Sequence, residues 1–297
     1  MINKIGEFGL IERFRQKIRT DASVAAGSGD DCAVLKFDQR RYQLFTCDML
    51  VEGVDFTSQD DPYLVGRKAV AVSISDIAAC SGSPRYCVIS LGLPKNTELK
   101  FADRVFKGMA ETARRYKVNI VGGDLSRSAR VVIDVSMLGV VRKKCLTLRK
   151  GAQPGDIIFV TGELGGSLRG KHLKFTPRVK EAEFLAGHVK VNAMIDISDG
   201  LAQDLGHILR RSNVGAVLYA GLVPLSKQAS GLSDALHGGE DFELLFTLSR
   251  KEAGKLLRMP RSLFSPIGEI WDKKRGFKLV DEKNRLVDIR AKGYRHF

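Results

Sequence analysis

The first half of the chain alternates apolar and polar positions in the way that strands and helices separated by turns require. Residues 62–81 carry apolar side chains at helical spacing and follow Asp61-Pro62, which is a favourable helix start. A second helix is predicted over roughly 98–117, and an amphipathic helix over residues 1–18. Three runs have the composition of strands, namely 42–47, 86–92 and 130–141. The pattern predicts a β/α half of about 140 residues.

A basic, turn-rich stretch separates this half from a second one. Residues 142–156 (RKKCLTLRKGAQPGD) contain Gly-Ala and Pro-Gly turn signals. We therefore predict an N-terminal domain over 1–145 and a C-terminal domain over 146–297. A strand followed by a helix is predicted over 193–213. Further strands are predicted at 156–162, 216–220, 242–248 and 264–270. The fold class is therefore α/β, with two domains.

Charge is distributed unevenly along the chain, whose formal net charge is +14. Residues 250–297 hold fourteen Lys and Arg against six Asp and Glu, whereas residues 30–61 hold eight acidic residues against three basic ones. A basic protein with one acidic stretch suits a site that collects divalent cations and then anionic phosphates. For the C-terminal tail, a solvated basic face without a partner is an equally good interpretation. That tail has few aromatic residues among its basic ones, so we do not expect nucleic-acid binding.

Composition also bears on the compartment. No apolar run approaches the roughly 20 residues that span a bilayer. The N-terminal residues lack the apolar region and cleavage site of a signal peptide. The five cysteines are scattered without a C-x-x-C pair, which argues against a disulfide framework and a structural zinc site. We expect a cytoplasmic protein without a membrane partner.

Acidic residues recur in short clusters near strand ends and turns. A single Asp after Gly is usually a turn residue or a helix N-cap, so each cluster taken alone favours that ordinary interpretation. The presence of six such clusters in one chain favours a common site. The six clusters are Gly29-Asp30-Asp31, Thr46-Cys47-Asp48, Ser75-Asp76, Gly122-Gly123-Asp124, Asp196-Ile197-Ser198-Asp199-Gly200 and Gly238-Gly239-Glu240-Asp241.

Three of these aspartates occupy positions that are unfavourable for a carboxylate. Asp48 and Asp196 each end an apolar strand, and Asp76 lies within VAVSISDIAAC, where helical packing buries it. A buried ionised carboxylate needs a partner, and two candidates are Lys68, eight residues upstream, and a metal ion. Carboxylates that converge to about 4 Å repel by about 4 kcal/mol per pair at an effective dielectric near 20. Mg²⁺ removes this repulsion and prefers carboxylate and phosphate oxygens, so the sequence predicts a magnesium site for phosphoryl chemistry.

One segment imitates a phosphate-binding P-loop. Residues 165–171 (GGSLRGK) have the G-x-x-x-x-G-K spacing and follow a predicted strand. The next residue is His172, which has no hydroxyl to bind Mg²⁺ as the Ser or Thr of a P-loop does. We therefore do not interpret this segment as a P-loop.

Taken together and in order, the motifs resemble those of thiamine-monophosphate kinases. The segments that carry the resemblance include GSGDDCAVL, TCDMLVEGVDF, RKAVAVSISDIAACSGSP, IVGGD, LRKGAQPGD, MIDISDGLAQDLGHI, HGGEDFELLF and KGYRHF. The resemblance extends over nearly the whole chain and implies the two-domain fold of aminoimidazole ribonucleotide synthetase-like proteins. It further implies a homodimer whose N-terminal domains form a β-barrel, with ATP and several Mg²⁺ ions in the cleft between domains.

The resemblance also implies roles for individual residues. ATP would contact Gly123, Asp124, Arg149 and Ser198. Thiamine monophosphate would contact Asp55, Glu240 and Tyr294, although Tyr294 also suits a packing role. The residues that would act directly in catalysis are Asp199 and Asp124. The metal ligands would be Asp31, Thr46, Cys47, Asp48, Asp76, Asp124, Asp196 and Asp199.

Two positions depart from the family pattern. Asp55 replaces the usual His, which adds negative charge near an anionic substrate, and Cys47 replaces the usual Thr or Ser. A thiol is a poor Mg²⁺ ligand, so Cys47 fits only through its carbonyl oxygen.

The expected reaction is direct transfer of the ATP γ-phosphoryl to thiamine monophosphate, giving thiamine diphosphate. Two relatives of the same superfamily, selenophosphate synthetase and the carbamoyl dehydratase of hydrogenase maturation, need a reactive thiol near one terminus. Residues 1–29 contain no Cys, and the last two residues are His296 and Phe297. Both alternatives are therefore disfavoured.

Overall fold

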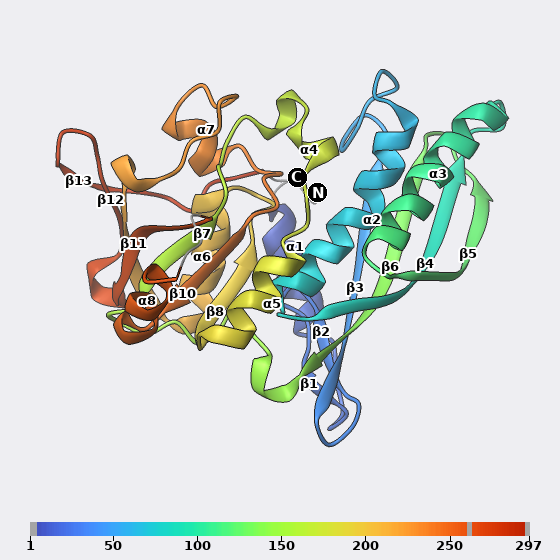
Figure 1. Ribbon diagram of the computed structural model, residues 1–297. Helices are drawn as coiled ribbons and strands as arrows, with labels where there is room; N and C mark the ends of the chain where they lie inside the picture. The colour runs from blue at the N-terminus through green and yellow to red at the C-terminus, as the bar shows by residue number, and fades with distance from the viewer. Residues whose placement is uncertain (1–4, 260–262, 295–297) are drawn as a thin grey trace.

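The first half of the chain forms an open six-stranded sheet. We analysed a computed structural model, which describes residues 5–259 and 263–294 (Figure 1). The sheet has the order β1-β2-β3-β6-β4-β5, in which β4 and β5 are parallel and the other pairs antiparallel. Its strands are β1 Val24–Ala26, β2 Ala33–Lys36, β3 Arg41–Val51, β4 Ser83–Leu93, β5 Asn119–Arg127 and β6 Val132–Arg142. Because both edges are free in one chain, this sheet does not close into a barrel.

Helices α2 (Pro62–Ala79) and α3 (Leu99–Arg115) pack together over one face of this sheet. Asp61 caps α2 by accepting a hydrogen bond from the Tyr63 amide, and Pro62 occupies the first helical position, as the sequence predicts. The N-terminal helix α1 covers Gly6–Arg15 within the described residues.

The second half forms a seven-stranded sheet with the order β13-β12-β9-β11-β7-β10-β8. Only β12 and β9 pair in parallel. The strands are β7 Ile157–Thr161, β8 Val191–Asp196, β9 Val214–Tyr219, β10 Leu244–Leu248, β11 Phe264–Asp272, β12 Phe277–Val280 and β13 Leu286–Asp288. The helices are α4 Lys171–Lys174, α5 Val179–His188, α6 Leu201–Ser212, α7 Leu232–His237 and α8 Arg250–Leu257.

Helix α2 lies between the two sheets and joins their cores (Figure 1). It contacts β3 and β6 of the first sheet, and α4, α5 and β8 of the second half. One continuous apolar cluster includes Ile74 and Ile77 of α2, Val135 of the first sheet, and Phe159 and Phe246 of the second. Thirteen of the eighteen residues of α2 are buried, which explains why its sequence is apolar on nearly all sides.

Two sequence predictions about strands were wrong. Strand β5 was missed because Gly122-Gly123-Asp124 has the composition of a turn, yet these residues lie in an edge strand. Asp48 does not end its strand, because β3 continues to Val51. By contrast, Asp196 is the last residue of β8, as predicted.

Close packing of α2 on α3 depends on two glycines, which generates a stability prediction. A Cβ atom at Gly66 would lie 1.9 Å from the Val105 carbonyl oxygen, and one at Gly108 would lie 2.0 Å from the Tyr63 carbonyl oxygen. Because the Val105 backbone cannot move away from an added methyl group, Gly66→Ala should lower the free energy of unfolding by about 1–3 kcal/mol. Chemical denaturation would measure this loss.

Gly187→Ala is the matched control. Gly187 lies in α5 with nothing within 4 Å of an added Cβ atom, so alanine there should be neutral or slightly stabilising. Equal stabilities of the Gly66→Ala and Gly187→Ala variants would contradict the predicted helix contact.

Candidate functional site

Buried and partly buried carboxylates from both halves of the chain meet beside α2. Asp31 precedes β2, Asp76 lies on α2 and Asp196 ends β8, and one carboxylate oxygen from each lies within 4.8 Å of the others. Asp48 of β3 lies in the same region, since its charge acts on Asp76. The sequence prediction that distant aspartates converge is therefore confirmed for this group.

Hydroxyl groups hold three of these carboxylates in place. The Ser75 hydroxyl donates to Asp196 at 2.6 Å, and the Ser73 hydroxyl donates to Asp48 at 2.7 Å. The Thr46 hydroxyl donates to Asp76. Thr46 thus orients a candidate ligand through its side chain, so a role for Thr46 as a metal ligand would fall to its carbonyl oxygen.

Burial and mutual repulsion raise the pKa values of this group. Burial is the largest cause in each case, and neighbouring carboxylates add to it. The pKa of Asp48 is raised to about 6, that of Asp196 to about 7, and that of Asp76 well above its usual value. Arg149 supplies a compensating positive charge, with its Nη2 donating to Asp31 Oδ1 at 2.7 Å.

Lys68 is not the partner of Asp76, which corrects one sequence hypothesis. Its side chain is fully buried, and its Nζ donates to Glu240 Oε1 at 2.6 Å and to the Asp55 carbonyl oxygen at 2.8 Å. Eight residues separate Lys68 from Asp76, which is more than two helical turns and places the ammonium beyond reach of that carboxylate. A metal ion, the other candidate partner of Asp76, is therefore favoured.

The donor set fits a hard divalent cation. Asp31 Oδ2 is buried and has no hydrogen-bond partner among the described residues, so one oxygen remains available. Within residues 5–259 and 263–294, the cluster offers carboxylate oxygens and no His or Cys ligand. Such ligands suit Mg²⁺ rather than Zn²⁺, and a bound cation would return these carboxyls to their ionised form.

The three residues predicted to contact the second substrate lie close together. Lys68 Nζ bonds both Glu240 Oε1 and the Asp55 carbonyl oxygen, which brings these two residues together. Partial burial raises the pKa of Tyr294, and the charges of Asp55, Glu240 and Asp199 add to the effect. The Tyr294 amide donates to the Asp199 carbonyl oxygen at 3.0 Å. The Tyr294 residue is 44% exposed, which argues against a packing role.

Glu240 has an unusual backbone that aims its side chain at this region. Its φ is +56°, a conformation that is unfavourable for a residue other than Gly and concentrates at functional sites. Its amide donates to the Ser198 carbonyl oxygen at 2.6 Å, which links the two glycine-rich loops. Oε1 bonds Lys68, whereas buried Oε2 has no partner among the described residues.

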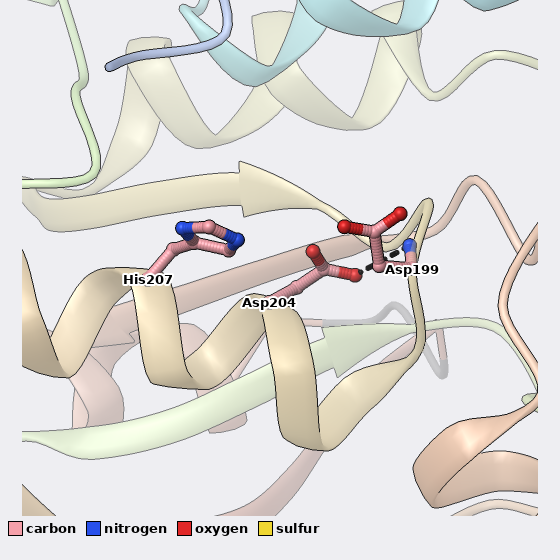
Figure 2. A group of neighbouring side chains, drawn as sticks. All are labelled: Asp199, Asp204 and His207. Carbon is pink, nitrogen blue, oxygen red and sulfur yellow. Dashed lines mark hydrogen bonds between the residues drawn. The ribbon is translucent and has the colours of Figure 1, made fainter. Parts of the chain in front are cut away.

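A second group of carboxylates lies at the start of α6 (Figure 2). Asp199, Asp204 and His207 each offer a ligand atom within 4.8 Å of the others. Asp204 accepts hydrogen bonds from the amides of Asp199 at 3.0 Å and Gly200 at 3.1 Å, and burial raises its pKa well above the usual value. Asp204 therefore fixes the turn that presents Asp199.

Sequence reasoning missed Asp204, although its spacing offered a signal. It falls in the first turn of α6, where a carboxylate commonly bonds the preceding amides. His207 packs edge-to-face on Phe8 with ring centroids 5.1 Å apart. Burial lowers the pKa of His207 to about 3, so its imidazole is neutral at physiological pH.

The side chains of Asp124 and Cys47 do not join the carboxylate cluster within one chain, and Gly123 has no side chain to contribute. Asp124 of β5 lies opposite Ser90 of β4, and Ser90 lies opposite Asp134 of β6. The three side chains therefore share the face of the sheet that α2 does not cover. Cys47 is exposed on that same face, because it pairs with Ser136 and alternates with buried Thr46 and partly buried Asp48. Their proposed roles stay predictions.

Comparisons with known proteins identify the family of the chain. Family models for the AIR synthase related protein match twice, the N-terminal domain over residues 29–141 and the C-terminal domain over residues 153–281. A thiamine-monophosphate kinase of Buchnera aphidicola subsp. Acyrthosiphon pisum is 34% identical, with 99% of each chain covered. One from Rhodopirellula baltica is 39% identical, with 83% of each covered. The chain belongs to the thiamine-monophosphate kinase family.

A solved structure supports the same conclusion for the fold. The structure of AaThiL complexed with AMPPCP and TMP has a TM-score of 0.88 and 30% identity to this family member, and the match covers 100% of this chain and 99% of that one. Of the helices in the described part of the chain, none is long and apolar enough to cross a membrane.

The P-loop-like segment of this thiamine-monophosphate kinase family member has a structural role. Lys171 Nζ lies 3.2 Å from Glu243 Oε1 and 3.6 Å from Asp241 Oδ1, and both carboxylates are buried. Arg178 forms two further bonds to Glu243, at 2.6 and 2.7 Å. Lys171 is thus committed to buried carboxylates, which agrees with rejecting a P-loop.

The raised pKa values of Asp48, Asp76 and Asp196 predict how stability depends on pH. Because the folded-state values lie above those of the unfolded chain, the protonated carboxyls stabilise the metal-free fold at low pH. This stabilisation is lost as the pH rises through about 6 to 7. The melting temperature without metal should therefore fall by a few degrees between about pH 5.5 and pH 8.

Magnesium should reverse most of that loss, with a larger rise in melting temperature at pH 8 than at pH 5.5. Asp76→Asn is the matched variant, and its melting temperature should depend less on both pH and Mg²⁺. A metal-free melting temperature that is constant or rising across this range would contradict the electrostatic account.

Proposed function

We propose that this protein transfers the γ-phosphoryl group of ATP to the phosphate of thiamine monophosphate, giving ADP and thiamine diphosphate, the last step in making that cofactor. The observation that carries this proposal is the adjacency of two groups. The buried carboxylates around Asp76 suit magnesium and phosphates, and the group formed by Asp55, Glu240 and Tyr294 suits a cationic ring. Asp199 connects them, since its carbonyl oxygen accepts the Tyr294 amide. The related AaThiL structure contains AMPPCP and TMP together.

Magnesium would be held by Asp31, Asp48, Asp76 and Asp196 on the buried side, with Asp199 facing the second substrate. Bound there, it would supply neutralisation of the charge shared by two anionic substrates, which is the main obstacle in phosphoryl transfer. Arg149 and Ser198 would bind the phosphates of ATP. The acceptor is a phosphate oxyanion at neutral pH, so direct in-line transfer needs no strong base and no covalent nucleophile.

Glu240 and Tyr294 would bind the thiamine moiety. Oε2 of Glu240, which has no partner in the part of the chain that the structure describes, offers negative charge to the thiazolium, and an exposed phenol ring offers a face for it. Asp55 is tied to its own turn, because its Oδ2 accepts the Val51 amide at 2.8 Å and its carbonyl oxygen binds Lys68. The hydrogen bond from the Val51 amide therefore occupies one carboxylate oxygen of Asp55, the acidic residue that replaces the usual His of the family.

A homodimer built on the open face of the first sheet completes the proposal. Large apolar side chains lie exposed there, including Phe45, Met49, Tyr86 and Val88. Several large apolar side chains exposed on one face of a sheet favour an association surface. A second copy would cover it, could close a β-barrel from two open sheets, and would bring Asp124 to an interface.

The domain and compartment assignments follow the same reasoning. We propose that residues 1–145 form the dimerising, ATP- and magnesium-binding domain and that residues 146–297 close the cleft. All five cysteines are free thiols, which suits a reducing cytoplasm.

An acceptor assay tests the proposed reaction. ADP release should occur with thiamine monophosphate, and the product should be thiamine diphosphate by chromatography. Thiamine should give little turnover, because its hydroxyl requires a general base that the acceptor phosphate does not. EDTA should abolish activity. Turnover only with formylglycinamidine ribonucleotide or selenide would place the chain elsewhere in its superfamily. A lack of turnover combined with tight, salt-sensitive nucleic-acid binding would overturn the kinase assignment.

The dimer is tested by its mass in solution. The chain mass is 32.7 kDa, so sedimentation at micromolar concentration should give about twice that value. Tyr86→Lys combined with Val88→Lys should produce monomers, because it places two charges on the apolar face. Leu257→Lys, at an exposed position of α8, should leave the dimer intact. A parent protein that sediments as a single 32.7 kDa species would refute the proposed interface.

A further inference from the structure

The loop that carries Glu240 has an unfavourable backbone. Residues 238–243 connect α7 to β10, and within them Gly239, Glu240 and Phe242 have φ values of +68°, +56° and +50°. Glycine adopts this left-handed conformation readily, whereas Glu and Phe do so only when surrounding contacts impose it. The amides of Glu240 and Phe242 donate to the Ser198 and Ile197 carbonyl oxygens, at 2.6 and 2.8 Å, which holds the loop from the side of β8.

The residue after Glu240 anchors the loop from another side. Asp241 is fully buried, and both of its carboxylate oxygens accept the Gly165 amide at 3.0 Å. Its Oδ1 also accepts the Ser167 hydroxyl. Gly165 and Ser167 belong to the P-loop-like segment 165–171. A buried carboxylate bonded in this way restricts the backbone of its own residue, and therefore the direction of the Glu240 side chain beside it.

Phe242 is held by the continuation of the same segment. Its ring stacks on that of Phe175, with centroids 4.0 Å apart and an interplanar angle of 19°. Both rings are buried and pack with Ala71 and Val72 of α2 in one apolar cluster. Residues 165–175, which we call the supporting segment, thus contact the two residues that follow Glu240.

The glycines of the supporting segment are explained by its own turn. Gly165 and Gly166 have φ values of +88° and +71°. A Cβ atom at Gly166 would lie 2.4 Å from the Gln228 carbonyl carbon. The two glycines that imitate a P-loop are therefore needed to bring the Gly165 amide and the Ser167 hydroxyl to Asp241.

We infer that the supporting segment sets the affinity for the acceptor, with Ser167 and Asp241 acting as positioning residues that hold Glu240 in its left-handed conformation. This inference rests on the proposed function, in which Glu240 contacts the thiamine moiety. The thiamine ring lies away from the phosphate that reacts. Loss of the support should therefore weaken binding of the ground state and of the transition state alike, which raises KM and leaves kcat unchanged.

Steady-state kinetics test the inference. Ser167→Ala should raise the KM for thiamine monophosphate about tenfold and leave kcat and the KM for ATP within about twofold of the parent. Thr161→Val is the matched control, because Thr161 is also buried and its hydroxyl donates to Glu243 Oε2 at 2.7 Å. The control should lower the melting temperature as Ser167→Ala does, without a change in KM.

A double-mutant cycle shows whether Ser167 acts through Glu240. Glu240→Gln alone should raise the KM for thiamine monophosphate about tenfold. Adding Ser167→Ala to Glu240→Gln should change KM by less than about twofold, because the group that Ser167 positions is already altered. A tenfold rise from Ser167→Ala in both backgrounds, or the same rise in Thr161→Val, would overturn the inference.

Hydrogen exchange of the ligand-free protein tests the support without the reaction. In Ser167→Ala and in Phe175→Leu, which keeps an apolar side chain, the amides of Glu240 and Phe242 should exchange at least about tenfold faster than in the parent. Unchanged exchange in both variants would overturn the inference. Faster exchange in a protein that does not phosphorylate thiamine monophosphate would overturn the proposed acceptor and retain the support of the loop.

Discussion

Repulsion among buried carboxylates is the constraint around which this molecule is organised. Asp31, Asp48, Asp76 and Asp196 come from four separate segments and meet where water is scarce. Each close pair would cost about 4 kcal/mol at an effective dielectric near 20 if both members were ionised. Hydroxyl donors and one arginine offset part of this energy, and cations would offset the rest. A site that is unfavourable when empty is thereby prepared for the metal and phosphates it is proposed to hold.

The site has a positively charged region and a separate negatively charged region, and each suits a different substrate. A cavity beside α1 is rich in arginine, whereas the neighbourhood of Tyr294 is acidic. The carboxylate cluster lies next to both. Lys68 stabilises the acidic side, because its buried ammonium binds one carboxylate oxygen of Glu240 and leaves the other oxygen of Glu240 available. The arginine-rich side would therefore favour the nucleotide, and the acidic side would favour the cationic ring of thiamine monophosphate.

The sequence predicts those features that depend on local pattern. Helix α2 follows from its periodicity and its Asp-Pro start, and the burial of Asp76 follows from its apolar neighbours. What it does not predict depends on contacts between distant segments. Lys68 could pair with several carboxylates, and only the folded chain selects Glu240, 172 residues away. Strand β5 was missed because its register against β4, and not its composition, makes it a strand. The role of Asp204 depends on the geometry of one turn.

The position of α2 has a consequence for how the chain unfolds. Its apolar residues belong to one cluster with side chains from both sheets, so separating the halves would expose Ile74, Ile77, Phe159 and Phe246 to water. The two halves are consequently not independent modules joined by a tether. A cut in the 142–156 connection would leave fragments that need each other to fold, and heat should disrupt both sheets in a single cooperative transition.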